Sequence, residues 1–456
     1  MPYLSPNNTS RGKVVMGRFF LKLFRAFVST MPAMYTAILI LVTVVCTVGL
    51  MLLFLNLTSG DKNIKYQIRT SYSVKDPQFL HVIGQLLGPP LVDGNRITSL
   101  LNGTEIFPAM LSAIREAKQT ICFETYIYWS GTIGAEISAA LCERAKHGVK
   151  VHVLLDWVGS NKIDNALLDD MQAAGVEVDR YRPLRWYNLS RINHRTHRKL
   201  LIVDGKIGFT GGVGIADEWT GNADSTEHWR DSHFRLDGPA VAQMQSTFMD
   251  NWIKTRSIVH HEQEYFPPLQ PAGEALAQVF KSSSREGSES ARLMYLLSIA
   301  SAEKTILLAN AYFVPDDLSV ESLINATRRG VKIQIIVPGK HTDKSIVRRA
   351  SRGTWGSLLK AGIEIYEYQP TMYHCKVMVV DGLWTSVGST NFDSRSFRLN
   401  DEANLNILDA EFAAHESKNF ADDLRRSKLI TLAEWERRPL RERISERWAG
   451  LFRSQL

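Results

Sequence analysis

The feature that most constrains the fold of this chain is an internal duplication. HGVKVHVLLD (147–156) matches RGVKIQIIVP (329–338), AGVEVDRYRP (174–183) matches AGIEIYEYQP (361–370), and HRKLLIVDG (197–205) matches HCKVMVVDG (374–382). The pairs occur in the same order and are offset by 182, 187 and 177 residues. Since a solenoid needs three or more repeats, two copies predict two similar halves related by a pseudo-twofold axis.

Within each half, helical and strand patterns alternate. PAMLSAIREAKQT has apolar residues at helical spacing, and the β-branched and aromatic run ICFETYIYW follows it. GAEISAALCERAKHG is again helical, and VKVHVLLD is a short apolar strand. The same order runs through residues 293–338. This alternation predicts an α/β fold with a mostly parallel or mixed sheet in each half.

A second constraint lies near the N-terminus. Residues 33–57 (AMYTAILILVTVVCTVGLMLLFLNL) are almost wholly apolar, and the chain carries no charge between Ala26 and Gly60. A helix of this length spans a bilayer with some tilt, and it exceeds the apolar region of a cleavable signal peptide. We predict a single transmembrane anchor rather than a buried core helix. No second run of this length follows, which excludes a polytopic transporter or channel.

The segment before the anchor, residues 1–32, is predicted to be a basic amphipathic helix in the membrane interface. Arg18, Lys22 and Arg25 share one helical face opposite three phenylalanines. Basic residues flank the anchor on both sides, so the positive-inside rule discriminates only weakly. It favours the N-terminus inside, which places the bulk of the chain across the membrane.

Composition divides the rest of the chain. The first half is predicted over 58–260 and the second over 293–456, with 261–292 as a linker because it is rich in Pro, Ser and Gly. Near the C-terminus a helical face carries four apolar residues among many arginines: Leu440, Ile444, Trp448 and Leu451. This face is predicted to pack on the second half, with membrane contact as the alternative.

Charge and cysteine content narrow the function classes. The net charge is +7, which suits an acidic partner such as an anionic membrane or nucleic acid. Four scattered cysteines are too few for a disulfide framework or a Cys-rich zinc site. The stretch 180–199 carries seven Arg and Lys residues, no Asp or Glu, and three aromatic residues interleaved among the basic ones. This mixture favours contact with lipid headgroups over nucleic acid, because the chain is already tethered to a bilayer.

The duplicated motif that can carry chemistry is H-x-K-x4-D followed by a turn of small residues. It comprises His197, Lys199 and Asp204 with Gly211 and Gly212 in the first half, and His374, Lys376 and Asp381 with Gly388, Ser389 and Asn391 in the second. Alternation along a strand puts His and Lys on one face, while Arg198 or Cys375 faces away. One His and one Lys from each half can therefore meet across the pseudo-twofold axis.

Such a cationic site suits a phosphodiester substrate. A neutral histidine can attack phosphorus to form a phosphohistidine, and a protonated one can donate to the leaving oxygen. The lysines, Ser389 and Asn391 would hold the phosphate oxygens, and the aspartates would stabilise the site or orient a histidine. Because the lysines supply positive charge, no metal or other cofactor is expected. The alternative is two unrelated H-x-K strands on a solvated edge.

The paired H-x-K-x4-D motifs resemble those of the phospholipase D superfamily, and the chain more narrowly resembles bacterial cardiolipin synthases. The resemblance spans roughly residues 80–456 and rests on FETYIYW (123–129), HRTHRKLLIVDGKIGFTGGVGIADEW (194–219), HWRDSHFRLDGPAV (228–241) and YHCKVMVVDGLWTSVGSTNFDSRSFRLNDEANL (373–405). It implies two phospholipase D-like α/β sandwich domains behind one transmembrane helix.

The resemblance also implies roles for individual residues. It makes His197 the nucleophile and His374 the acid and base, with Lys199 and Lys376 binding phosphate. It places Glu402 and Glu124 beside the site in supporting positions. In the first half Gly212 and Gly214 stand where Ser or Asn is common, so that half should offer fewer donors to phosphate.

The implied activity is phosphatidyl transfer that makes cardiolipin from phosphatidylglycerol, with phosphatidylethanolamine as another possible donor. The expected setting is a bacterial inner membrane, with a single-pass anchor and no nucleic-acid partner. Three alternatives stay open: a hydrolase releasing phosphatidic acid, a non-catalytic lipid-binding scaffold, and a nuclease. The sequence leaves the oligomeric state and the membrane side undetermined.

Overall fold

The computed structural model describes residues 22, 25, 33–57, 64–184, 193–283 and 289–456. The chain forms two compact units, Met1–Thr58 and Ser59–Leu456. Apart from Lys22 and Arg25, the predicted amphipathic segment 1–32 lies outside the described residues.

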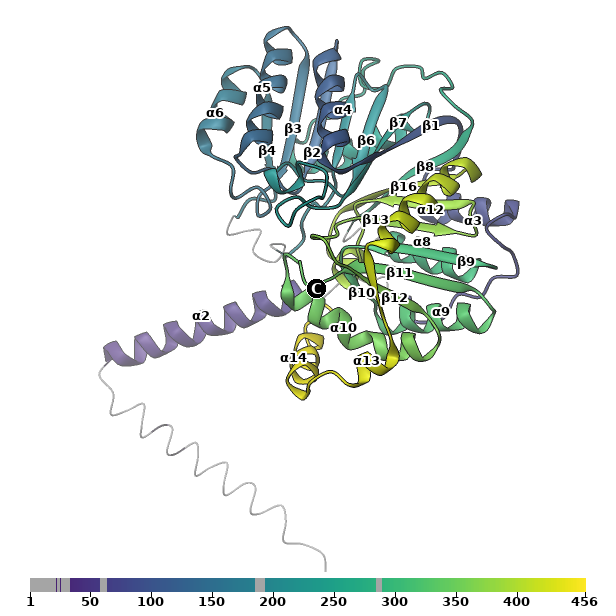
Figure 1. The fold of residues 1–456 in the computed structure, drawn as a ribbon. Coiled ribbons are helices and arrows are strands. Elements are labelled where there is room, and N and C mark those ends of the chain that lie inside the picture. The colour runs from purple at the N-terminus through teal and green to yellow at the C-terminus, as the bar shows by residue number, and fades with distance from the viewer. Residues whose placement is uncertain (1–21, 23–24, 26–32, 58–63, 185–192, 284–288) are drawn as a thin grey trace, which may run out of the picture. The chain divides into compact units, whose positions relative to one another are not determined.

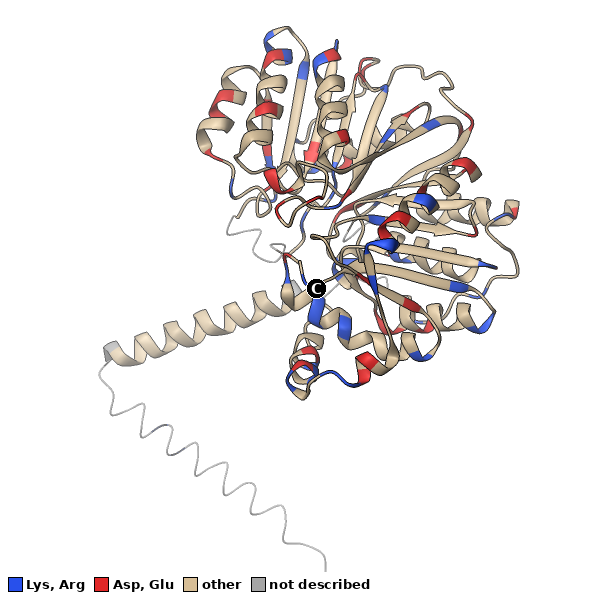
Figure 2. Cartoon of the chain, viewed as in Figure 1, with Lys and Arg blue, Asp and Glu red and all other residues tan. Residues whose placement is uncertain are grey.

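The first unit contributes one long helix, α2 (Ala33–Leu57), as the apolar run predicts (Figure 1). Its segment Tyr35–Phe54 has a mean hydropathy of 2.9, and none of its residues is buried in the protein. Figure 2 shows that α2 carries no charged residue. Among the described residues it is the one helix long and apolar enough to cross a membrane.

The second unit is built on one mixed sheet, and the two halves of the chain contribute equivalent strands on either side of its centre. The strand order is β17-β12-β11-β9-β13-β14-β16-β8-β1-β7-β6-β5-β2-β3-β4, and the halves join where β8 pairs antiparallel with β1. The first-half strands are β1 (Val92–Leu101), β2 (Thr120–Thr125), β3 (Lys150–Asp156), β4 (Glu177–Tyr181), β5 (Leu200–Val203), β6 (Ile207–Gly211) and β7 (Ser232–Asp237).

The second half repeats this order with one additional edge strand. Its strands are β8 (Ala275–Ser282), β9 (Thr305–Asn310), β11 (Lys332–Pro338), β12 (Glu364–Tyr368), β13 (Lys376–Val380), β14 (Trp384–Gly388), β16 (Glu402–Leu408) and β17 (Ser427–Ile430). A small parallel pair lies apart, β10 (Phe313–Val314) with β15 (Phe392–Asp393). The predicted duplication and mixed sheet are therefore confirmed.

Helices cover both faces of the sheet, as the alternating pattern predicts. One core lies under α4 (Asn102–Glu116), α5 (Thr132–Lys146) and α6 (Asn165–Ala173). Another lies under α3 (Pro77–Leu87), α8 (Ser290–Ala300), α9 (Asp317–Arg328) and α10 (Ser345–Lys360). A central core unites both halves through α7 (Val241–Arg256) and α12 (Ala410–Arg425). The described helices are completed by the short α11 (Ser394–Arg398) and by α13 (Leu432–Glu436) and α14 (Leu440–Gly450).

The domain boundaries differ from those that composition predicts. Residues 261–292 contain β8, an almost wholly buried strand that pairs with β16 on one edge and β1 on the other, rather than a linker. Helix α3 precedes the first-half strands, yet Phe79 and Ile83 pack in the second-half core, with Phe79 edge-on to Trp384. The second half thus contains chain from both the expected first domain and the expected linker.

The C-terminal helix also departs from expectation. Leu440, Ile444, Trp448 and Leu451 are 60–75% exposed, so the prediction that they pack on the second half is wrong. Helix α14 instead packs through Glu446 and Ala449, on its opposite side. The periodicity was sufficient to identify an apolar face, but it could not show which face contacts the domain.

Candidate active site

The two H-x-K segments meet because each one pairs with backbone of the other half. The His197 N–H donates to the Asp401 carbonyl at 2.8 Å, and the His374 N–H donates to the Arg230 carbonyl at 2.7 Å. Asp401 and Arg230 immediately precede the residues that lead into β16 and β7. The pseudo-twofold axis therefore runs between the histidine segments, as the duplicated motif predicts.

The side chains cross between the halves in the same way. Nδ1 of His197 lies 3.0 Å from a Glu402 carboxylate oxygen, and Nδ1 of His374 lies 2.8 Å from Oδ2 of Asp231. Each carboxylate fixes the orientation of the histidine from the opposite half through Nδ1, so the chemistry falls to Nε2. Nε2 of His374 lies 3.3 Å from Nζ of Lys376, which places a motif lysine beside that reacting atom. Glu402 thus contacts a motif histidine directly, in line with its expected supporting position.

Both motif lysines are buried beside the histidines. Nζ of Lys199 donates to the His197 carbonyl at 2.8 Å, and Nζ of Lys376 donates to the His374 carbonyl at 2.7 Å. Burial lowers the pKa of both lysines, that of Lys199 to about 7. In this enclosed site the ammonium groups lack bulk water and a full set of anions, so an incoming phosphate would favour their charged forms.

The electrostatics distinguish the two histidines. Burial and then Lys199, Lys376 and His374 lower the pKa of His197 to well below its usual value. The pKa of His374 is also lowered, by burial and by Lys376, but Asp231 opposes that shift.

The pKa values of the two carboxylates that contact the histidines shift in opposite directions. Burial acts to raise the pKa of Asp231, but the charge of His374 and its hydrogen bond outweigh burial, so the net shift is downward. Burial raises the pKa of Glu402 to about 7, against the opposing charge of Lys199. His374 therefore faces the more firmly ionised carboxylate, which makes it the better proton carrier.

Aromatic rings surround the histidines. Tyr126 meets the His197 ring edge-on at 5.2 Å between centroids. Around His374 stand Trp219, Trp229 and Tyr312, at 5.3, 5.6 and 6.2 Å. The sequence predicts a supporting position for Trp229 but no role for the other three rings, because their convergence depends on the folded topology.

The small-residue turns have different partners in the two halves. Ser389 donates to Glu402 at 2.5 Å. The corresponding residue of the first half, Gly212, has no side chain, and a Cβ there would lie 2.1 Å from Oδ1 of Asp231. The glycine thus makes room for the shorter carboxylate to reach His374. Its neighbour Gly211 has φ +156°, and a Cβ there would lie 2.6 Å from the Ser232 carbonyl of β7.

The other predicted phosphate ligand is Asn391, which is buried. Its Oδ1 has no hydrogen-bond partner among the described residues. A substrate hydroxyl group could pair with this oxygen, since an unpaired buried amide oxygen is costly.

The two motif aspartates are not brought to the histidines. Asp204 follows β5 at its far end, with φ +52°, and its carboxylate accepts N–H groups of Lys118, Gln119 and Thr120. Asp381 repeats this arrangement at Glu303, Lys304 and Thr305. Both carboxylates hold the turn that leads from a helix into the strand beside the motif strand.

A substitution of Asp204 separates a structural from a catalytic role. Because Asp204→Ala leaves three backbone donors without their acceptor and puts Ala at positive φ, we expect it to lower the free energy of unfolding by about 2 kcal/mol. The turnover of the folded fraction should stay about unchanged. Chemical denaturation and activity per folded molecule measure the two effects, with Asp204→Asn as the milder control. A large loss of turnover without loss of stability would contradict this role.

Glu124 lies beneath the first motif rather than beside a histidine. Its Oε1 accepts from the Thr196 hydroxyl at 2.5 Å and from the Asn251 amide at 2.7 Å. Burial raises its pKa to about 7, although the nearby Arg198 opposes the shift. Glu124 thus positions the residue before His197. Arg198 faces away from the site, as predicted, and pairs with Asp250 at 3.0 Å.

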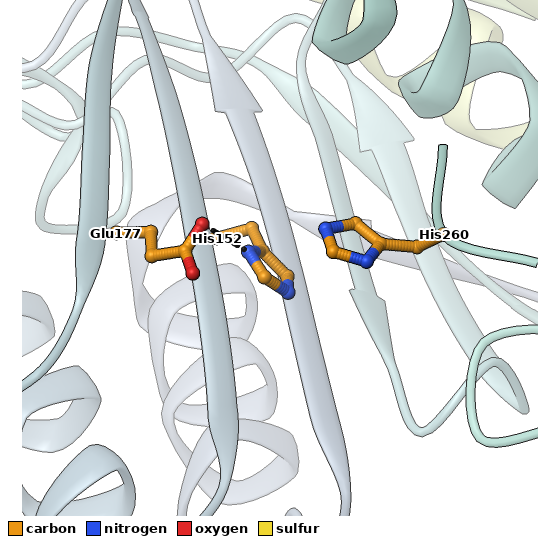
Figure 3. A group of neighbouring side chains, drawn as sticks. All are labelled: His152, Glu177 and His260. Atoms are coloured by element: carbon orange, nitrogen blue, oxygen red, sulfur yellow. Dashed lines mark hydrogen bonds and ion pairs between the residues drawn. The ribbon is translucent and has the colours of Figure 1, made fainter. Parts of the chain in front are cut away.

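Outside the paired motifs, one group of potential metal ligands occurs among the described residues: His152, Glu177 and His260 (Figure 3). Nδ1 of His152 lies 3.3 Å from Glu177 and Nε2 lies 2.7 Å from the Tyr265 hydroxyl, so both ring nitrogens are engaged. Arg256 lies 3.7 Å from the same Glu177 carboxylate and opposes a cation there. We interpret the group as packing that holds the chain after α7 against β3.

The basic and aromatic stretch at 180–199 is described only in part. Arg185, Trp186, Tyr187 and Arg191 lie outside the described residues. Arg182 and Arg195 instead have structural contacts, with the His194 carbonyl at 3.3 Å and 2.9 Å. The expected lipid contact of this stretch stays a prediction.

Comparison with known structures supports the fold. Phosphatidylserine synthase of Haemophilus influenzae superposes with a TM-score of 0.65 at 14% identity, covering 83% of this chain and 100% of that one. At this identity the likeness shows the architecture alone.

Comparison with known sequences shows the family. Residues 110–252 and 295–424 match the family described as "Cardiolipin synthase, PLD-like domain". Cardiolipin synthase 1 of Bacillus anthracis is 32% identical over 88% of this chain and 80% of its own length. Cardiolipin synthase A of Pseudomonas syringae is 33% identical over 78% of this chain and 74% of its own. The chain therefore belongs to the phospholipase D superfamily, in the family of cardiolipin synthase-like proteins.

Proposed function

We propose that this chain, a phosphatidyltransferase of the phospholipase D superfamily, makes cardiolipin from two molecules of phosphatidylglycerol with His197 as nucleophile. The observation that carries the proposal is the crossed pair of contacts, Glu402 to His197 and Asp231 to His374. It gives two histidines that are each oriented through Nδ1 and have different electrostatic surroundings, as a two-step transfer requires.

In the first step Nε2 of neutral His197 attacks the phosphorus of a phosphatidylglycerol. The N–P bond forms as the bond from phosphorus to the glycerol oxygen breaks, and protonated His374 gives its proton to that oxygen. Glycerol leaves, and a phosphatidyl-histidine remains. Lys199 and Lys376 would balance the charge on the non-bridging oxygens.

In the second step the primary hydroxyl of another phosphatidylglycerol replaces the glycerol. Neutral His374 takes the hydroxyl proton, the new O–P bond forms, and the N–P bond to His197 breaks. The products are cardiolipin and the free enzyme with His374 protonated again. The low pKa of His197 and the ionised carboxylate beside His374 support this division of roles.

The setting we propose is a bacterial inner membrane, with α2 as a single-pass anchor. The segment Tyr35–Phe54 has the length and hydropathy for this role, and the relatives named above are synthases of a membrane lipid, cardiolipin. Phosphatidylethanolamine could enter as donor by the same steps, since its headgroup alcohol is the leaving group.

Product analysis tests the proposal. The full chain in nanodiscs that contain phosphatidylglycerol should release glycerol and cardiolipin in equal amounts, read by mass spectrometry. Phosphatidic acid without cardiolipin would show that water is the acceptor and would replace synthase by hydrolase. Absence of any product with both phosphatidylglycerol and phosphatidylethanolamine would overturn the proposal.

A further inference from the structure

The C-terminal helix α14 presents an apolar face that the protein itself does not cover. Leu440, Ile444 and Trp448 recur every four residues and are 69%, 60% and 62% exposed. Leu451 and Phe452 extend the same face just beyond the helix and are 75% and 41% exposed. Large side chains gathered in this way on one helix mark a surface that contacts something apolar.

The opposite side of α14 is firmly attached, so this exposure does not come from a loosely placed helix. Glu446 is buried and accepts from Arg438 at 2.7 Å and from Arg352 of α10 at 3.3 Å. Ala449 packs with Val347 and Ala350 of α10. The attached side fixes the direction of the apolar face relative to the second half.

Basic side chains border this face. Arg441, Arg443 and Arg447 are exposed and form no ion pair within the described structure. A hollow of about 470 Å³ between α10 and α14 is lined by Arg438, Arg443, Arg447 and Arg453, together with Leu440 and Ile444. The exposed acid of the helix, Glu442, lies 3.7 Å from Arg352. Apolar side chains bordered by uncompensated arginines match the acyl boundary and the phosphates of an anionic bilayer.

The residues after α14 connect this face to the rim of the candidate active site. Gln455 accepts from Asn193 at 2.9 Å, and its carbonyl accepts from Arg395 at 3.0 Å. Asn193 lies four residues before His197, and Arg395 lies between Asn391 and Glu402. Leu456 and Tyr312 pack against the same small apolar cluster, and the Tyr312 ring lies 6.2 Å from that of His374. Both halves of the site are therefore tied to the segment that α14 carries.

We propose that the α14 face, defined as Leu440, Ile444, Trp448, Leu451 and Phe452, docks the catalytic unit on an anionic lipid bilayer. This attachment is separate from the α2 anchor and sets which side of the catalytic unit meets the lipid. A second copy of the chain is the weaker occupant, because Arg441, Arg443 and Arg447 would be brought against their counterparts across a twofold interface.

Depth-dependent quenching in the full chain tests this docking. In a Cys46→Ser, Cys142→Ser background, an Ile444→Cys variant is labelled with an environment-sensitive fluorophore and reconstituted in nanodiscs. Leu86→Cys is the matched control, because Leu86 is a similarly exposed apolar residue on helix α3, at 54%. Nanodiscs contain phosphatidylcholine alone or with phosphatidylglycerol, each with and without lipids that carry a quencher below the headgroup.

We expect the label at 444 to be quenched severalfold more than the label at 86, and more strongly with phosphatidylglycerol. Equal quenching at the two positions would overturn the proposal. The proposal would also be overturned if the fluorescence of the label at 444 changed with protein concentration and not with the lipid quencher. That result would show that the face binds a second copy of the chain. This readout needs no turnover, so it stands or fails separately from the proposed phosphatidyl transfer.

The charge contribution is tested by Arg443→Gln with Arg447→Gln. We expect this variant to lose the extra quenching that phosphatidylglycerol causes at 444, while quenching in phosphatidylcholine changes little. Raising the salt concentration should mimic the variant. If phosphatidylglycerol still increases quenching at 444 after both changes, the arginines do not bind the anionic lipid surface and that part of the proposal is wrong.

Discussion

His197→Ala is expected to abolish cardiolipin formation, with turnover reduced at least about 10⁴-fold. The loss is this large because the proposed reaction proceeds through a covalent bond to Nε2, which no neighbouring side chain can replace. Mass spectrometry of phosphatidylglycerol nanodiscs measures the product. His152→Gln is the matched control, since it removes another buried histidine of the same half that does not contact the motif residues.

The assignment of the two roles has its own test. His374→Ala lacks the acid that the glycerol leaving group needs, but a phosphatidyl p-nitrophenyl ester leaves without protonation. With that donor the variant should form the N–P bond at His197 and then stall, because deprotonation of the acceptor is also impaired. Peptide mapping at alkaline pH should find the phosphatidyl group on His197. A wild-type adduct on His374 would reverse the assignment.

The second large effect is expected from Asp231→Asn, which should lower turnover by about 10²–10⁴-fold. Asp231 holds Nδ1 of His374 at 2.8 Å and thereby fixes the ring and its tautomer. The amide would keep the shape of the side chain but lose the negative charge. Substrate binding should change much less, because the lysines that hold phosphate remain.

The pH profile should move in a defined direction. Asp231 raises the pKa of His374 against burial and Lys376, so Asn at this position lowers that pKa further. His374 then loses its proton at lower pH, and the alkaline limb of the turnover profile should shift to lower pH. Glu402→Gln provides the comparison, because it disturbs the other histidine and should leave that limb in place. An unshifted limb in Asp231→Asn would contradict the pairing.

Much of the fold was predictable because the internal duplication indicates two similar halves related by a pseudo-twofold axis, even before helices and strands are assigned. The matched segments around His197 and His374 predict that the two motifs face each other, and they do. The boundary between halves was not predictable from composition. Strand β8 lies in a segment that begins with Pro-rich sequence, and its central place depends on pairing with β1 and β16.

The site was predictable where the motif is repeated and less so elsewhere. The His and Lys residues recur as a spaced pattern, whereas Asp231 belongs to HWRDSHF and corresponds to Glu402 only through the equivalence of β7 and β16. Asp204 and Asp381 were placed among the catalytic candidates because they share the motif, although a strand of several residues separates them from the histidines. Linear proximity to a reactive residue does not measure distance along an extended strand.

The crossed carboxylates have a consequence for how the enzyme comes into being. During synthesis from the N-terminus, His197 emerges long before Glu402, and Asp231 emerges long before His374. His197 has no partner carboxylate until β16 has been made, and the contact between Asp231 and His374 also needs chain of the second half. A nascent or truncated chain without Glu402 and His374 therefore lacks the paired site, and reactivity toward phospholipids begins only after both halves have been made.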